Sequence, residues 1–238
     1  MRELLIALDV DTADRACELT DQLGAVAGGF KIGSQLFTGE GPSIVRRVVE
    51  DGHRVFLDLK YHDIPNTVSH AVRVAADLGV WMLTVHAAGG TEMLAAAHEA
   101  AARHLHAPLV VAVTVLTSFG DSRLQEIGVP PPISGQVTRL ASLAQEAGVD
   151  GVVASPLEIE LVTRQCGGDF TIVTPGIRQA VQPQKGRIPG EDQIRTMSAG
   201  DAMRAGAHYL VVGRPVVAAA DPKAAALAIE RDVRERGQ

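Results

Sequence analysis

The sequence is poor in aromatic residues, cysteine and long hydrophobic runs. Aromatic residues make up 3% of its 238 residues and hydrophobic residues 46%, so its core must be built from Ala, Val, Leu and Ile. That composition is usual for proteins in which helices cover a parallel sheet. No apolar run reaches the roughly 18 to 20 residues of a membrane-spanning helix, and the first run, Leu4 to Leu8, is too short for a signal peptide. We therefore expect a cytoplasmic protein that does not enter a membrane.

The chain also lacks blocks of like charge and clusters of metal ligands. It carries 22 basic and 28 acidic residues, a net charge of −6, which gives no indication of a surface for nucleic acid or an anionic membrane. Cys17 and Cys166 stand alone and match no redox or metal-binding spacing, so we interpret them as reduced core thiols. The eight histidines are scattered, and no metal site, dinucleotide fingerprint or P-loop is indicated.

Short apolar runs alternate with helical patterns along the whole chain. The strand candidates are Leu4 to Val10, Phe30 to Gln35, Arg54 to Lys60, Trp81 to His86, Leu109 to Leu116, Gly151 to Ala154, Thr171 to Thr174 and Tyr209 to Val212. The helix candidates are Asp14 to Val26, Pro42 to Glu50, Asn66 to Leu78, Thr91 to Arg103, Gly135 to Ala147, Leu157 to Gln165, Ala199 to Ala205 and Pro222 to Arg234. Most of the strand candidates are continuously apolar, which indicates burial on both faces. This order predicts an α/β protein, a (β/α)8 TIM barrel, as a single domain over residues 1–238.

Two connections are longer than the fold requires. Ser118 to Ile133 contains three consecutive prolines, and Gln179 to Gln193 is polar and rich in glycine. Long connections in a compact domain are more often functional than idle. In a barrel both follow the C-terminal ends of strands, the face that carries active sites.

The strongest chemical signal is the segment from Asp58 to Thr67, DLKYHDIPNT. It follows an apolar strand, so Asp58 and Lys60, two residues apart, are expected on the same side of that strand. A neighbouring carboxylate stabilises the ammonium group, whereas an anionic substrate group brought beside it is repelled. The segment therefore indicates electrostatics directed at a reacting molecule, with a salt bridge at a strand end as the simpler alternative.

Polar residues also end the other strand candidates. They are Asp9, Lys31 with Gly33, His86, Thr117 with Ser118, Ser155, Pro175 with Gly176, and Gly213 with Arg214. In a closed barrel these residues meet at one mouth, and Lys31 comes to lie beside Asp58 from the neighbouring strand. We expect lysines and carboxylates to alternate there in one network.

Two segments near the C-terminus favour a phosphate site. Gly213 and Arg214 end the last strand and open a short helix, where glycine permits close backbone approach and arginine adds charge-assisted bonds. A glycine turn beside a surface arginine is the alternative. Arg178 follows the neighbouring strand and places a second arginine near the same anion, which favours the phosphate.

The histidines near the cluster have two readings. His62 lies within the cluster, where a contact with substrate is one interpretation. The simpler interpretation is that His62 makes no such contact. His86 ends a strand, and we expect it to make a buried hydrogen bond that organises the mouth of the barrel.

The segment from Asp58 to Val68 resembles the signature of the orotidine 5′-phosphate decarboxylases of the bacterial type. Further motifs follow in that family's order over essentially the whole chain: Leu8-Asp9, Phe30-Lys31-Ile32-Gly33, Leu116-Thr117-Ser118, Pro175-Gly176-Ile177-Arg178, Asp192-Gln193-x-Arg195 and Val212-Gly213-Arg214. The first segment is specific, whereas a Gly-Arg pair after a strand is not. The stretch between Arg178 and Gln193 is longer than in many relatives, so Lys185 or Arg187 can stand in for Gln193.

The resemblance implies a reaction that needs no cofactor and no metal. Orotidine 5′-monophosphate loses carbon dioxide to give uridine 5′-monophosphate, the last step of pyrimidine nucleotide synthesis. By this resemblance Lys60 delivers a proton to C6 of the pyrimidine, and Asp58 lies beside the departing carboxylate. Lys31 bridges Asp58 and the ribose hydroxyls, and Asp9 accepts a ribose hydroxyl bond.

The resemblance also implies a homodimer whose two active sites are shared. Asp63, Ile64 and Thr67 are then expected to reach the site of the partner subunit, Asp63 as a catalytic residue. The remaining substrate contacts implied are Thr117 and Ser118 at the pyrimidine edge, Arg178, Gln193, Gly213 and Arg214 at the phosphate, and Pro175. The segment Gln179 to Gln193 is expected to close as a lid.

Two other functions remain open. Metal-dependent sugar-phosphate lyases of the same barrel group, the hexulose-phosphate synthases and keto-gulonate-phosphate decarboxylases, share an Asp-x-Lys-x-x-Asp core. A barrel that binds phosphate without catalysis is the second alternative, and the intact network of lysines and carboxylates argues against it.

Overall fold

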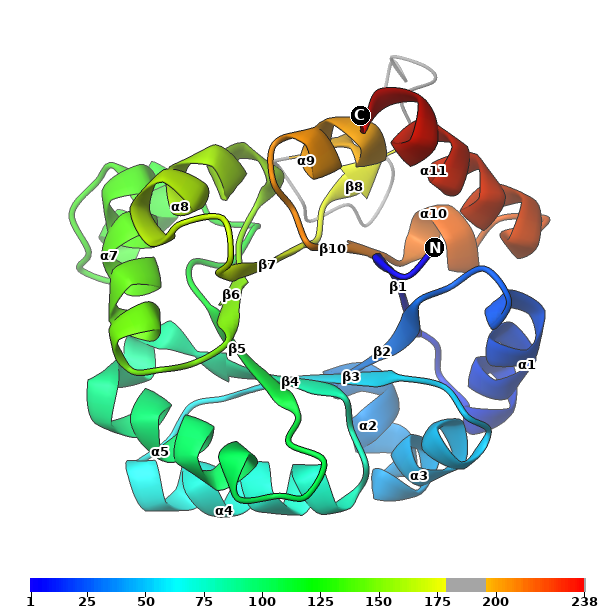
Figure 1. The fold of residues 1–238 in the computed structure, drawn as a ribbon, viewed down its shortest axis with the longest axis horizontal. Helices are drawn as coiled ribbons and strands as arrows, with labels where there is room; N and C mark the ends of the chain where they lie inside the picture. Colours follow the sequence, from blue (N-terminus) through cyan, green and yellow to red (C-terminus); the bar gives the residue numbers. More distant parts are fainter. Residues whose placement is uncertain (179–195, 238) are drawn as a thin grey trace.

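Eight parallel strands close into a barrel with the helices outside it (Figure 1). The computed structural model describes residues 1–178 and 196–237. Around the barrel the strand order is β1, β10, β7, β6, β5, β4, β3 and β2. Their bounds are β1 Leu4–Ala7, β2 Gly29–Gly33, β3 Val55–Tyr61, β4 Met82–His86, β5 Leu109–Val113, β6 Gly151–Val153, β7 Thr171–Thr174 and β10 Tyr209–Val212. The predicted TIM barrel is confirmed.

The helices occupy the intervals between the strands. The eight expected ones are α1 Ala13–Leu23, α3 Pro42–Glu50, α4 Pro65–Asp77, α5 Gly90–Ala102, α7 Ile133–Glu146, α8 Ile159–Cys166, α9 Ala199–Arg204 and α11 Pro222–Arg236. Thr12, Ser198 and Asp221 cap three of them with side-chain oxygens that accept a backbone N–H of the first turn. Prolines at the first turns of α3, α4 and α11 suit helix starts, because that position needs no N–H donor.

Several short elements depart from the expected pattern. The run expected as a strand to Gln35 ends at Gly33, and Ser34–Glu40 forms helix α2, which buries Leu36. Within the connection from Ser118 to Ile133, Asp121–Glu126 forms helix α6 around the buried Leu124. Short 3-10 turns, Ala87–Gly89 and Pro156–Glu158, precede α5 and α8, and Arg214–Val217 forms α10. Outside the barrel, β8 (Ile177–Arg178) pairs with β9 (Met197–Ser198).

The apolar core has two parts, which reflects the two faces of the barrel sheet. The larger part lies between strands and helices and includes Leu4, Ile6, Phe30 and Leu57. A smaller cluster fills the barrel interior, where Phe56 is the large fully buried side chain. Burial on both faces accounts for the continuously apolar strand sequences.

Cys17 and Cys166 are buried and not disulfide-bonded, as expected for core thiols, and burial raises the pKa of both. Within residues 1–178 and 196–237, none of the helices combines the length and the hydropathy needed to cross a membrane.

Strand β3 is irregular where the charged cluster begins. Its pairing with β4 runs in register through Leu57 and Leu83 and resumes only at Tyr61 and Val85. Three residues of β3 thus lie opposite the single residue Thr84 of β4, which defines a β-bulge. Although bulges redirect side chains, Lys60 Nζ lies 2.8 Å from Asp58 Oδ1, so the two side chains meet on one side of β3, as predicted.

The close packing of β6 against β7 gives a test of the barrel. A methyl group at Gly151 of β6 would collide with the backbone carbonyl of Thr171. We predict that Gly151→Ala lowers the free energy of unfolding by about 1–3 kcal/mol, measured by urea denaturation. Gly168→Ala is the matched control, because nothing lies within 4 Å of its added methyl group. Equal stability of the two variants would contradict this packing.

Candidate active site

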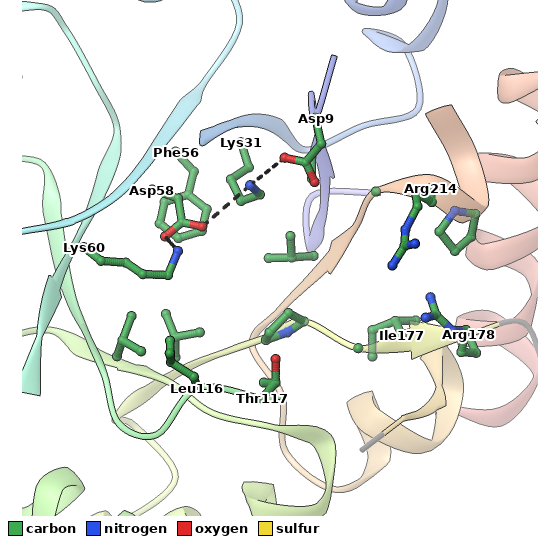
Figure 2. A pocket seen from close by; sticks show the side chains of 18 of the residues that line it. Asp9, Lys31, Phe56, Asp58, Lys60, Leu116, Thr117, Ile177, Arg178 and Arg214 are labelled. Carbon is green, nitrogen blue, oxygen red and sulfur yellow. Dashed lines mark hydrogen bonds and ion pairs between the residues drawn. The ribbon is translucent and has the colours of Figure 1, made fainter. Parts of the chain in front are cut away.

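A pocket opens at the C-terminal ends of the barrel strands, where the polar ring was predicted (Figure 2). Its volume of about 230 Å³ suits a small molecule and not a polymer. The expected residues that line it are Asp9, Lys31, Asp58, Lys60, Thr117, Pro175, Arg178, Gly213 and Arg214. They come from both halves of the chain and meet only because the barrel closes.

Four charged side chains form a continuous network on one side of the pocket. Lys31 Nζ lies 3.1 Å from Asp9 Oδ1 and 3.6 Å from Asp58 Oδ2. Lys60 Nζ lies 2.8 Å from Asp58 Oδ1. The order Asp9, Lys31, Asp58, Lys60 alternates in sign, as predicted, and Figure 2 shows the four side chains in that order.

Asp58 is the most constrained acid of this network, with a side chain that is 15% exposed. Burial alone would raise the pKa of its carboxyl group. The ammonium groups of Lys31 and Lys60, with hydrogen bonds from Lys60 and Thr84, outweigh that effect and hold the pKa below its ordinary value of 3.8. Asp58 is therefore a carboxylate at neutral pH.

Lys60 is held from its backbone as well as its ammonium group. Its φ of 53° is left-handed, and among the residues that the structure describes no other non-glycine residue has a positive φ. This conformation costs a side-chain-bearing residue about 1–2 kcal/mol. The Lys60 N–H donates to Thr84 Oγ1 at 2.8 Å, and the ammonium group donates to Asp58 at 2.8 Å. Such strain is typical of functional positions.

Two arginines face this network from the other side of the pocket. Figure 2 shows Arg178 and Arg214 together, away from Lys60 and Asp58. Arg178 belongs to β8, and Arg214 is the first residue of α10, separated from β10 by Gly213. Beside them lies Gly213, where an added Cβ would come within 3.2 Å of Asp9 Oδ2, so a larger residue there would press on Asp9. This end of the pocket suits a phosphate group.

Apolar side chains that the sequence reasoning missed form the floor between the two charged ends. They are Ala7, Phe56, Val113, Val115, Val153 and Val211, with Leu116 and Ile177 nearer the mouth. Their position in the sequence could have indicated them. Phe56 lies two residues before Asp58, and Val211 two residues before Gly213, so each points to the same side of its strand as the expected site residue. Their apolar character made them indistinguishable from core residues.

Comparison with known proteins identifies the family. The model of the "Orotidine 5'-phosphate decarboxylase / HUMPS family" matches residues 2–229. The chain belongs to this family. It is 51% identical over 237 residues to the orotidine 5′-phosphate decarboxylase of Moorella thermoacetica, covering 97% of this chain and 92% of that protein. The enzyme of Alkalilimnicola ehrlichii is 51% identical over 230 residues, covering 97% of this chain and 95% of that protein.

A solved structure of the family agrees with the fold. The crystal structure of orotidine 5′-phosphate decarboxylase from Lactobacillus acidophilus superposes with a TM-score of 0.84 at 36% identity, covering 98% of this chain and 99% of that one. The resemblance inferred from the segment Asp58 to Val68 is therefore confirmed.

Some residues that the family resemblance suggested lie away from this pocket. Asp63, Ile64 and Thr67 are exposed at the start of α4, with Ile64 67% exposed. Ser118 is half-buried and does not line the pocket, and its carbonyl accepts a bond from Arg123. Gln193, Lys185, Arg187 and the expected lid Gln179 to Gln193 fall outside the described residues.

The histidines of this family member lie beside the network and not in it. His62 is exposed and does not line the pocket of its own chain. Its ring stacks on His86, with centroids 5.2 Å apart, and His86 Nδ1 accepts the N–H of Ala88 at 3.3 Å. Within residues 1–178 and 196–237, no three His, Cys, Asp or Glu side chains are arranged to hold a metal ion.

The environment of His86 predicts a pH dependence of stability. Burial, followed by the charges of His62 and Lys60, lowers the pKa of His86 below its ordinary value of 6.5. The unfolded chain then binds a proton more readily than the folded one, so folded stability decreases as pH falls from about 6.5 towards the lowered pKa. We predict a ring titration midpoint below 6.5 by NMR.

His86→Gln should reduce this loss of stability, measured as the free energy of unfolding at several pH values. His70→Gln, which removes an exposed histidine of α4, is the matched control and should behave as the unmodified protein does. A His86 midpoint at or above 6.5 would overturn the assignment.

Proposed function

We propose that the chain decarboxylates orotidine 5′-monophosphate to uridine 5′-monophosphate, the last step of pyrimidine nucleotide synthesis. One observation carries the proposal. The alternating network of Asp9, Lys31, Asp58 and Lys60 lies across one small pocket from Arg178 and Arg214. Such a site holds a dianionic phosphate at one end and directs charge at a reacting atom at the other. Family membership and 51% identity to a decarboxylase support it.

Phosphate binding supplies the first part of the mechanism. Arg178 and Arg214 offer guanidinium groups to the phosphate, and Gly213 permits close backbone approach. Gln193 is proposed as a further phosphate contact, by resemblance. Binding energy at this non-reacting end offsets the cost of bringing the substrate carboxylate beside Asp58.

The reacting end uses the centre of the network. Asp58 lies beside the substrate carboxylate, and the C6–carboxylate bond breaks to release carbon dioxide. The electron pair stays on C6, where the Lys60 ammonium stabilises it and then transfers a proton to it. Lys60 is neutral after this step and regains its proton from solvent. Asp58 stays ionised because Lys31 and Lys60 lower its pKa.

The magnitudes favour charge stabilisation over repulsion as the main effect. Repulsion between Asp58 and a substrate carboxylate 4 Å away contributes about 4 kcal/mol at an effective dielectric constant near 20. Enzymes lower barriers by roughly 8–23 kcal/mol. The larger share must therefore come from the fixed ammonium group at C6 and from phosphate binding.

The remaining pocket residues orient the nucleoside. Lys31 is proposed to bridge Asp58 and the ribose hydroxyls, and Asp9 to accept a ribose hydroxyl bond; the two side chains already share a 3.1 Å bond. Thr117 and Pro175 line the pocket on the pyrimidine side, where Ser118 is proposed to join them on substrate binding.

A shared active site accounts for the residues that face outward. Asp63, Ile64 and Thr67 are exposed, and they do not line the pocket of their own chain. We propose that they complete the pocket of a second copy in a homodimer. Burial of Ile64, now 67% exposed, would stabilise that interface through the hydrophobic effect.

The reaction is tested with purified protein treated with EDTA. We predict that it converts orotidine 5′-monophosphate at the same rate as untreated protein. The loss of ultraviolet absorbance measures this conversion. The alternative is a metal-dependent sugar-phosphate lyase. No conversion of the nucleotide, together with metal-dependent turnover of a hexulose or keto-gulonate phosphate, would establish that alternative instead.

The shared site is tested by mixing two inactive variants. Lys60→Ala removes the proton donor, and Asp63→Ala removes the residue proposed to cross the interface. In a heterodimer one site carries both changes and the other carries neither. We predict that an equimolar mixture recovers about a quarter of the unmodified activity after subunit exchange. An absence of recovery, with heterodimers demonstrated by mass spectrometry, would place Asp63 in its own chain's site.

A further inference from the structure

We propose that Thr84 is a positioning residue that sets the relative placement of Asp58 and Lys60 for proton delivery. Thr84 lies in β4, is fully buried, and does not line the pocket. The inference rests on the proposed decarboxylation, in which Lys60 donates the proton.

The Thr84 hydroxyl connects the two reacting side chains directly. It accepts the Lys60 backbone N–H at 2.8 Å and lies 3.0 Å from Asp58 Oδ1. A hydroxyl group has one proton. Since the amide can only donate and the carboxylate can only accept, the hydroxyl proton points at Asp58. Thr84 therefore fixes an anionic Asp58 and the backbone of Lys60 with one oxygen atom.

The β-bulge explains why a side chain is needed at this point. Between the pairs Leu57–Leu83 and Tyr61–Val85, three residues of β3 lie opposite Thr84. Regular strand pairing cannot serve the Lys60 N–H there, and Lys60 has the left-handed φ of 53°. A buried donor left unsatisfied is costly. The Thr84 hydroxyl replaces the missing backbone acceptor and so stabilises the strained conformation that directs Lys60.

The same contact places the Lys60 ammonium group. Asp58 Oδ1 accepts from both Thr84 and Lys60 Nζ, at 3.0 and 2.8 Å. Lys60 is thus held at its backbone by Thr84 and at its ammonium group by Asp58, and Thr84 also bonds Asp58. Arg178 and Arg214 lie across the pocket from Asp58 and Lys60 (Figure 2), so removal of the Thr84 hydroxyl should affect the chemical step more than substrate binding.

The test compares variants that differ by one hydroxyl group. We predict that Thr84→Val lowers kcat about tenfold to a hundredfold, the expected effect of losing a hydrogen bond to a charged group. KM should change by less than about threefold, since the phosphate contacts remain. Thr84→Ser keeps the hydroxyl and should restore most of kcat. Thr20→Val is the matched control, because Thr20 is equally buried and its hydroxyl donates to the Cys17 carbonyl within α1, away from the pocket.

A second readout needs no catalysis. Thr84→Val should raise the pKa of Asp58, because the hydroxyl bond favours its ionised form. The carboxyl ¹³C signal of Asp58 in the ligand-free protein, assigned with Asp58→Asn, should titrate at higher pH in Thr84→Val than in Thr84→Ser. If Thr84→Val does not fold, Thr84→Ala against Thr84→Ser makes the same comparison.

Each outcome decides the inference. Reduced kcat with a raised Asp58 pKa, both reversed in Thr84→Ser, supports it. An unchanged kcat and an unchanged Asp58 titration would overturn it, as would equal losses of kcat in Thr84→Val and Thr20→Val. If the unmodified protein does not convert orotidine 5′-monophosphate, the proposed function fails, and the Asp58 titration still decides whether Thr84 controls this carboxylate.

Discussion

The site depends on one buried carboxylate held between two ammonium groups. Asp58 is 15% exposed at its side chain and contacts Lys31, Lys60 and Thr84. Burial opposes its charge, and the two lysines reverse that effect. An ion pair with one member removed leaves an uncompensated buried charge, so these residues act as a unit. These charges already contact one another without a ligand, so the field that they direct into the pocket is preorganised.

The barrel assembles this unit from neighbouring strands and places the phosphate end across the mouth. Asp9 lies just beyond β1, whereas Lys31 and Asp58 lie within β2 and β3; these three strands pair side by side. Gly213 follows β10, which pairs with β1. A closed parallel barrel brings all strand ends to one face. The apolar floor, with Phe56 at its base, lowers the local dielectric around the network and strengthens its interactions.

Much of this arrangement could be predicted from the sequence because it follows from periodicity and strand ends. Continuous apolar runs indicated the barrel, and Lys31 came to lie beside Asp58 as expected. The bulge in β3 could not be predicted, since it depends on the pairing partner Thr84. The apolar floor was missed because its residues are identical in type to core residues. Helix α2 was missed because its first residues, Ser34 and Gln35, were assigned to the preceding strand.

The most direct test of this account is the rate of decarboxylation in Lys60→Ala, measured beside Lys223→Ala, which removes an exposed lysine of α11. We predict that Lys60→Ala loses at least about a hundredfold in kcat, the scale of a positioned proton donor. Its affinity for orotidine 5′-monophosphate should stay within about tenfold, because Arg178 and Arg214 remain. Lys223→Ala should match the unmodified enzyme. Retention of more than about 5% of kcat in Lys60→Ala would contradict the central role of the Asp58–Lys60 pair.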